Sequence, residues 1–238
     1  MLKFSDARNF GRTFTGLALI AGPLVFLIAQ IVSPDVDNDN KLTELNDIAA
    51  HKGTYLFGGI LFLLGGAILL GASIGLIHLF RDRRVTLGQV AAVLLALGSA
   101  ATFAFYTFVV VEYEMVNQPG LDRAQMAKLL HESNEAASGL PIFILFIVGI
   151  VIGLILLAIA AWRRRVVPPW AALVILVGGV IAFFSQSKAL GIVDFVILLV
   201  GLGWLGTAVL STSDDQWDGP RGAEAPPGAA AVEPGPAS

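Results

Sequence analysis

The chain has 238 residues, of which 56% are hydrophobic and 14% are charged, with a formal net charge of −3 at pH 7. Soluble domains carry about 25% charged residues, so this composition excludes a single water-soluble domain, whose core could not bury so many Val, Leu and Ile side chains. The absence of cysteine excludes disulfides, thiolate catalysis, thiolate metal sites and palmitoylation.

Long apolar stretches recur along the whole chain. Each is close to the roughly 20 residues that a helix needs to cross a bilayer core. Backbone groups in lipid must bond within the protein, which leaves helices or a closed barrel, and the strict alternation of barrel strands is missing here. The sequence therefore predicts an all-α, polytopic transmembrane helical bundle of six spans within residues 14–211. The predicted spans are residues 14–33, 54–80, 88–111, 140–162, 169–187 and 190–211.

The two ends of the chain differ from this bundle. Residues 1–13 are predicted to be a cytoplasmic N-terminal segment. The first span is longer than the apolar region of a secretory signal and has no small-residue cleavage site after it, so we expect it to be retained. Pro23 should kink this span. From residue 212 the composition shifts to Pro, Gly, Ala, Asp and Glu, which predicts a disordered cytoplasmic tail over residues 212–238.

Two of the connections between spans contain apolar residues at helical spacing. Residues 41–52 and 121–135 are therefore predicted to be short helices on the outer surface, with their apolar sides on lipid or protein. A shift of 80 residues aligns His51 with His131 and the arginine turn at 83–84 with that at 163–164. This weak match leaves open whether the unit of outer helix, span, turn and span is a true internal repeat.

Basic residues predict the orientation in the membrane. With six spans, nine of them fall on the side of both termini, whereas the opposite loops are acidic. Positive charge stays on the cytoplasmic side, so we predict a multi-pass protein of the bacterial plasma membrane with both termini inside. The nine residues are Lys3, Arg8, Arg12, Arg81, Arg83, Arg84, Arg163, Arg164 and Arg165.

Asp194 is the one carboxylate that falls well inside a predicted span. A charge in the bilayer core is costly, which makes such a residue a candidate functional group. One interpretation is a proton or cation relay that faces the bundle interior. The other is a carboxylate near the interface that pairs with Lys188 or caps the start of the sixth helix.

Glu112, His51 and His131 are further candidates near the outer surface. Glu112 and Glu114 do not share a helix face at this spacing, so we interpret them as an interfacial boundary and not as an acid/base pair. Together with the two histidines and Glu135 they offer imidazole and carboxylate ligands, but no metal-binding motif surrounds them. His78 is the one histidine within a span, and it lacks the partner that a haem site would need. We expect no metal and no cofactor.

Glycines at spacings of four residues mark close helix packing. Gly71 with Gly75 and Gly149 with Gly153 follow the small-residue pattern of membrane helix interfaces. Gly201, Gly203 and Gly206 match a dinucleotide pattern, but they lie within an apolar helix and not between a strand and a helix. We expect these glycines to serve packing inside the bundle, with a homo-oligomer through the same faces as the alternative.

Several short motifs resemble those of uncharacterised multi-span membrane proteins of high-GC Gram-positive bacteria. They are Gly22 to Ala29, Asp47 to His51, Gly75 to Arg81 and Val167 to Ala172, and the likeness covers most of residues 14–210. The resemblance implies a helical membrane protein from a family of unknown function. It implies no functional residue for this chain.

Catalysis needs polar groups that converge on one place, and the predicted spans are almost bare of such groups. We therefore expect a non-enzymatic membrane protein with a structural or accessory role. The alternative is a small transporter or ion pathway that uses Asp194 as its coupling carboxylate. An enzyme that works at the outer surface with His51 and His131 is a third, weaker hypothesis. The expected partners are membrane lipids, and no nucleic acid.

Overall fold

The computed structural model describes residues 7–36, 40–81, 86–135, 140–184, 187–213 and 217. These residues form helices and no strand. The helices in chain order are α1 (Ala7–Val32), α2 (Lys41–Ala50), α3 (Lys52–Leu79), α4 (Leu87–Asn117), α5 (Arg123–Glu135), α6 (Leu140–Ile147), a π-helical segment η1 (Val148–Ile152), α7 (Gly153–Arg163), α8 (Pro169–Phe184) and α9 (Lys188–Ser211). The prediction of an all-α helical bundle is confirmed.

Five helical segments are long and apolar enough to cross a membrane. They are α1, α3, α4, α9 and the continuous segment α6–η1–α7, which runs from Leu140 to Arg163. α8 is equally apolar but has 16 residues, so it spans about 24 Å at 1.5 Å per residue, against a hydrocarbon core of about 30 Å. The structure therefore supports a multi-pass membrane protein, and the fifth predicted span, residues 169–187, corresponds to a helix shorter than the other spans.

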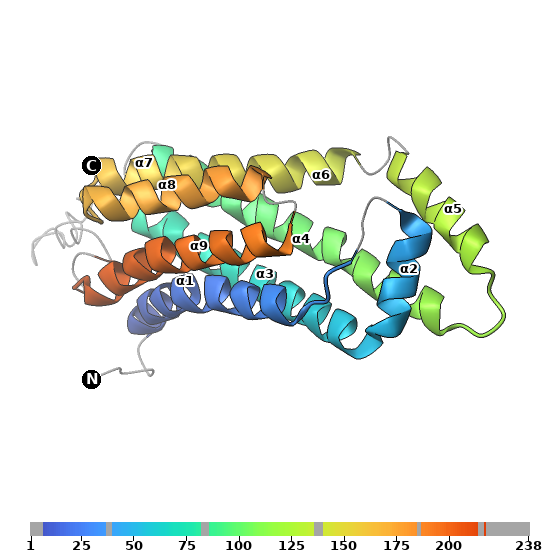
Figure 1. Cartoon of the computed structure of the whole chain (residues 1–238). Helices are drawn as coiled ribbons and strands as arrows, with labels where there is room; N and C mark the ends of the chain where they lie inside the picture. Colours follow the sequence, from blue (N-terminus) through green and yellow to red (C-terminus); the bar gives the residue numbers. More distant parts are fainter. Residues whose placement is uncertain are drawn as a thin grey trace, which may run out of the picture.

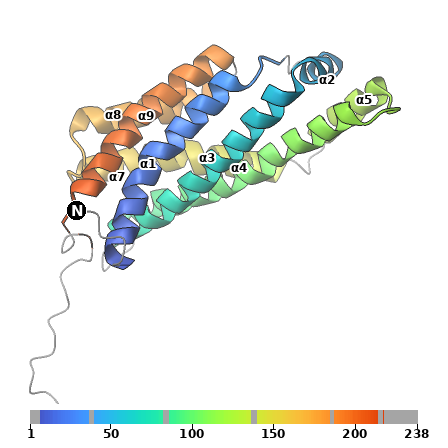
Figure 2. The ribbon, with the colours of Figure 1, turned by 90° about the horizontal axis from the view of Figure 1, so that it is seen from below.

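The long helices form a closed ring. α3 packs between α1 and α4, α4 packs against α6–η1–α7, α7 packs against α8, and α9 packs between α8 and α1 (Figures 1 and 2). The start of α1 and the end of α9 lie at one end of this bundle, and α2 and α5 lie at the other (Figure 1). We call the end that carries α2 and α5 the cap end.

Glycines set how closely the helices approach. A Cβ atom added at Gly149 would lie 2.4 Å from the Cα and the N of Gly98, so these two backbones are in direct contact. A Cβ at Gly75 would overlap the side chain of Thr15, and one at Gly206 would lie 2.6 Å from the carbonyl oxygen of Gly16. The small-residue faces are therefore used within one chain. Gly203 departs from the expected packing role, because nothing lies within 4 Å of a Cβ added there.

The predicted outer helices occur at residues 41–50 and 123–135, and both pack on protein. Leu45 and Ile48 of α2 are fully buried in a second apolar core with Val116 of α4 and Leu130 of α5. Asn40 caps α2, since its side chain accepts hydrogen bonds from the N–H groups of Leu42 and Thr43. α4 extends past its predicted end at residue 111, and this extension packs against α2, on which α5 packs in turn.

The structure describes parts of both predicted terminal segments. The described part of the N-terminal segment is helical, and the described part of the tail packs on the bundle. Residues 7–13 continue α1, although we placed them in a separate N-terminal segment. Arg12 Nη1 donates a hydrogen bond to the carbonyl of Thr212. Trp217, which falls in the predicted disordered tail, is 7% exposed, and its ring centroid lies 5.0 Å from that of His78. The other tail residues, 214–216 and 218–238, lie outside the described part.

Candidate functional site

Asp194 lies in the second turn of α9 and is buried inside the protein. Its residue exposure is 3%, and its Oδ1 atom has no hydrogen-bond partner among the described residues. At 100° per residue, Asp194 shares a helix face with Leu198 and Gly201. This face packs against α8, because a Cβ at Gly178 would contact Leu198 and one at Gly201 would contact Ile175. The carboxylate thus points into the bundle and away from the headgroups.

The structure gives Asp194 neither of the two interfacial roles considered from the sequence. Ser187 caps α9, since its Oγ accepts a hydrogen bond of 3.3 Å from the N–H of Leu190. Lys188 Nζ donates a hydrogen bond of 2.6 Å to the carbonyl of Ser33 and so ties the start of α9 to the end of α1. Asp194 therefore does not cap its helix, and the ammonium group of Lys188 is engaged elsewhere.

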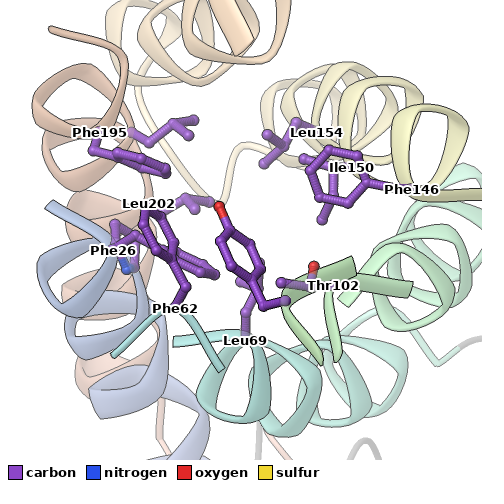
Figure 3. Close-up of a pocket in the computed structure, with 12 residues that line it drawn as sticks. Phe26, Phe62, Leu69, Thr102, Phe146, Ile150, Leu154, Phe195 and Leu202 are labelled. Atoms are coloured by element: carbon purple, nitrogen blue, oxygen red, sulfur yellow. The ribbon is translucent and has the colours of Figure 1, made fainter. Parts of the chain in front are cut away.

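A cavity lies in the centre of the helix ring, beside the face of α9 that carries Asp194. It offers about 70 Å³ to the centre of a water-sized sphere, and its lining is almost entirely apolar. Figure 3 shows Phe26, Phe62, Phe195 and Leu202 on one side of the cavity and Phe146, Ile150 and Leu154 on the other. The full lining is Pro23, Phe26, Phe62, Leu69, Thr102, Tyr106, Phe146, Ile150, Leu154, Phe195, Leu198 and Leu202.

Aromatic rings form one wall of this cavity. Phe62 stacks on Tyr106 with ring centroids 4.4 Å apart, and Phe195 stacks on Phe26 at 5.4 Å. Phe62 also contacts both Phe26 and Phe195. Such pairs add about 0.5–1.5 kcal/mol each beyond area burial, so the wall is held by contacts among four helices and not by any single one.

Thr102 and Tyr106 are the residues of the cavity lining that carry a side-chain hydroxyl. Thr102 donates its hydroxyl hydrogen bond to the carbonyl of Gly98, one turn earlier in α4. Asp194 is not part of the lining, although its neighbour Phe195 is. The carboxylate and the cavity therefore do not form a polar pocket together, although Leu198, one turn from Asp194 on the same helix face, belongs to the lining.

A polar cluster lies at the cap end, where α2, α3 and α4 meet. The Tyr55 hydroxyl of α3 donates a hydrogen bond to Glu112 of α4. Within α2, Lys41 pairs with Glu44, whose residue exposure is 5%. The charges of Lys41 and Glu44 both act on Glu112. Glu112 is therefore fixed by packing between helices, whereas Glu114 is exposed, so the two glutamates do not act as a pair.

The sequence interpretation missed Lys41, Glu44 and Tyr55 as partners of Glu112. No local signal marks them, because Tyr55 and Glu112 are 57 residues apart in the chain. Tyr55 and Glu112 meet at the cap end, where α3 and α4 extend beyond the end of α1 (Figure 1). The one signal in the sequence is the position of Tyr55 near the start of the long apolar helix α3.

The two candidate histidines lie on the surface. His51 is exposed at the end of α2, with its Nδ1 atom 3.1 Å from the carbonyl oxygen of Asp47. His131 is exposed on α5. Within the described residues, no three His, Asp or Glu side chains are grouped as a metal ion would require. The structure therefore does not bring His51, His131 and Glu112 together as ligands.

The Tyr55–Glu112 contact leads to a stability prediction. Tyr55→Phe should lower the free energy of unfolding by about 1–2 kcal/mol, because the half-buried Glu112 carboxylate loses a donor that water replaces only in part. Tyr113→Phe, next to Glu112 on the same helix, removes an equal hydroxyl and should change stability by less than about 0.5 kcal/mol. Unfolding of the purified protein in mixed detergent micelles measures both. An equal effect of the two substitutions would contradict this role for Tyr55.

Comparison with known proteins adds one result to this geometry. Neither the curated proteins nor the solved structures yielded a match to this chain. A family described as a domain of unknown function, DUF4386, matches residues 14–211, which covers the whole helix ring and the cap helices. The chain belongs to this family of multi-helix proteins, the domain of unknown function DUF4386.

Proposed function

We propose that this protein is a non-enzymatic protein of the bacterial plasma membrane with a structural or accessory role. The observation that supports this proposal best is the nature of the buried interior. The main core consists of Ala, Leu, Ile, Val and aromatic side chains contributed by α1, α3, α4, α7, α8 and α9. The buried hydroxyls of Thr15, Ser73 and Thr102 bond to carbonyls of their own helices, whereas the buried Ser99 Oγ has no hydrogen-bond partner among the described residues.

The proposed orientation has both termini in the cytoplasm. The arginines at residues 12, 81 and 163–165 all belong to the end of the bundle opposite the cap, and positive charge favours the cytoplasmic side. The cap helices would then face outward. A C-terminal alkaline phosphatase fusion should be inactive and a C-terminal green fluorescent protein fusion should fluoresce. An active phosphatase fusion would overturn this orientation.

A second function is favoured by one specific observation, the buried Asp194 with its unpartnered Oδ1 atom. Ionisable groups inside transmembrane helices often serve ion or proton pathways. In this alternative the protein is a small transporter or ion pathway, and Asp194 is the coupling carboxylate between α8 and α9.

Flux measurements on proteoliposomes separate the two functions. With an imposed proton gradient and a potassium gradient, the accessory role predicts that wild-type vesicles and protein-free vesicles leak at the same rate. A flux that is present with the wild type, lost in Asp194→Asn and retained in Asp35→Asn would overturn the accessory role in favour of the pathway. Asp35 is a suitable control because it is exposed near the end of α1.

A further inference from the structure

Two of the helices that line the cavity are irregular where they pass it. Pro23 lies within α1 and is itself part of the lining. On the opposite side, the π-helical segment Val148–Ile152 contributes Ile150 to the lining. Proline and π-segments bend helices, and π-segments often accompany functional sites. A proline within α1 and a π-helical segment thus lie on opposite sides of the same cavity.

The chemistry of the lining selects an apolar occupant. A buried water needs two to four polar partners, and the cavity wall exposes almost no polar surface. The volume of about 70 Å³ is about half that of an engineered apolar cavity of roughly 150 Å³ that binds benzene. The end of a hydrocarbon chain fits this space, whereas a larger fused ring system does not.

α6 is the least covered part of the helix ring beside the cavity. None of the residues of α6 is buried, although Phe146 at its end lines the cavity. α6 packs mainly against α4, and it continues past the end of α8 (Figure 1). Its side chains Leu140, Ile142, Phe143, Ile144 and Leu145 are exposed and apolar, so in a membrane this part of the ring borders lipid chains.

We propose that the central cavity binds the end of a hydrocarbon chain from a membrane phospholipid, which enters from the lipid beside α6. The occupant makes van der Waals contacts with the aromatic wall of Phe26, Phe62 and Phe195 and with Ile150 opposite. This site goes beyond the proposed accessory role. It does not depend on Asp194, because the carboxylate is not part of the lining.

Photo-crosslinking of the full chain in phosphatidylcholine vesicles tests the site. A small fraction of the phospholipid carries a diazirine at the end of one acyl chain, and mass spectrometry maps the adducts after illumination. Adducts are expected on cavity residues such as Phe62, Ile150 and Leu198 as well as on lipid-facing residues. A parallel sample with a diazirine fatty acid tests whether the hydrocarbon chain comes from a phospholipid or from a free fatty acid. If the fatty acid alone labels the cavity, the cavity is a hydrocarbon site whose ligand is a free amphiphile and not a phospholipid.

Cavity-filling variants provide the control. Ile150→Phe should reduce the cavity adducts by about tenfold, the factor expected when about two methylene groups lose their burial. Ile152→Phe, an exposed position in the same segment, should leave them unchanged. Leu198→Phe and its exposed partner Leu190→Phe on α9 repeat the comparison if Ile150→Phe does not fold. Adducts confined to lipid-facing residues, or equal cavity labelling in filled and control variants, would overturn the proposal while leaving the flux result untouched.

Discussion

Gly149→Leu is expected to lower the free energy of unfolding by about 3 kcal/mol or more, the upper range for overpacking. The atoms that the new Cβ would meet are backbone atoms of Gly98, at 2.4 Å, and the carbonyl oxygen of Leu94, at 2.7 Å. No side-chain rotation can relieve such a contact, so α4 and the η1 segment would have to move apart. Because Ile150 follows directly, the separation should also disturb the cavity wall.

Gly203→Leu is the matched control for this prediction. Gly203 also lies within an apolar helix, but nothing lies within 4 Å of a Cβ added there. The substitution should be neutral or stabilising by up to about 1 kcal/mol, because glycine is a poor helix former. Detergent-mediated unfolding followed by circular dichroism compares the variants. A Gly149→Leu protein as stable as Gly203→Leu would show that the backbones of Gly98 and Gly149 are not in contact.

The second large effect is expected at Asp194. Asp194→Leu should raise the free energy of unfolding by about 1–3 kcal/mol, because an apolar side chain of similar size replaces a buried carboxylate whose Oδ1 atom has no described partner. Asp194→Asn should keep the fold with a smaller change, since an amide is less costly to bury than a charge. The exposed Asp35 provides the control, and Asp35→Leu should change stability by less than about 0.5 kcal/mol.

The sign of the Asp194→Leu effect is informative in itself. A stabilised variant means that the native protein keeps a destabilising group, which natural proteins do mostly at functional sites. The flux assay on the same variants then shows what the group is used for. A loss of more than about 1 kcal/mol would contradict the prediction and would indicate that the carboxylate makes a stabilising interaction in the folded protein.

The helices themselves follow from the sequence. Apolar stretches such as residues 54–80 lack the alternation of strands, and a chain in lipid must bond its backbone internally, so the helix α3 at Lys52–Leu79 is a local consequence of composition. The short helices α2 and α5 were likewise visible in the helical spacing of their apolar residues. The resemblance to a family of unknown function was confirmed by the match over residues 14–211.

The direction of each side chain within the ring was decided by tertiary structure. Almost every face of α9 is apolar, so its sequence does not distinguish the side that carries Asp194 from the sides that meet lipid. The contact of α9 with α8 makes that distinction. In the same way, the pairing of Tyr55 with Glu112 and the approach of Gly98 to Gly149 join distant parts of the chain. Local periodicity carries no information about such pairs, because they depend on which helices become neighbours and at what register they pack.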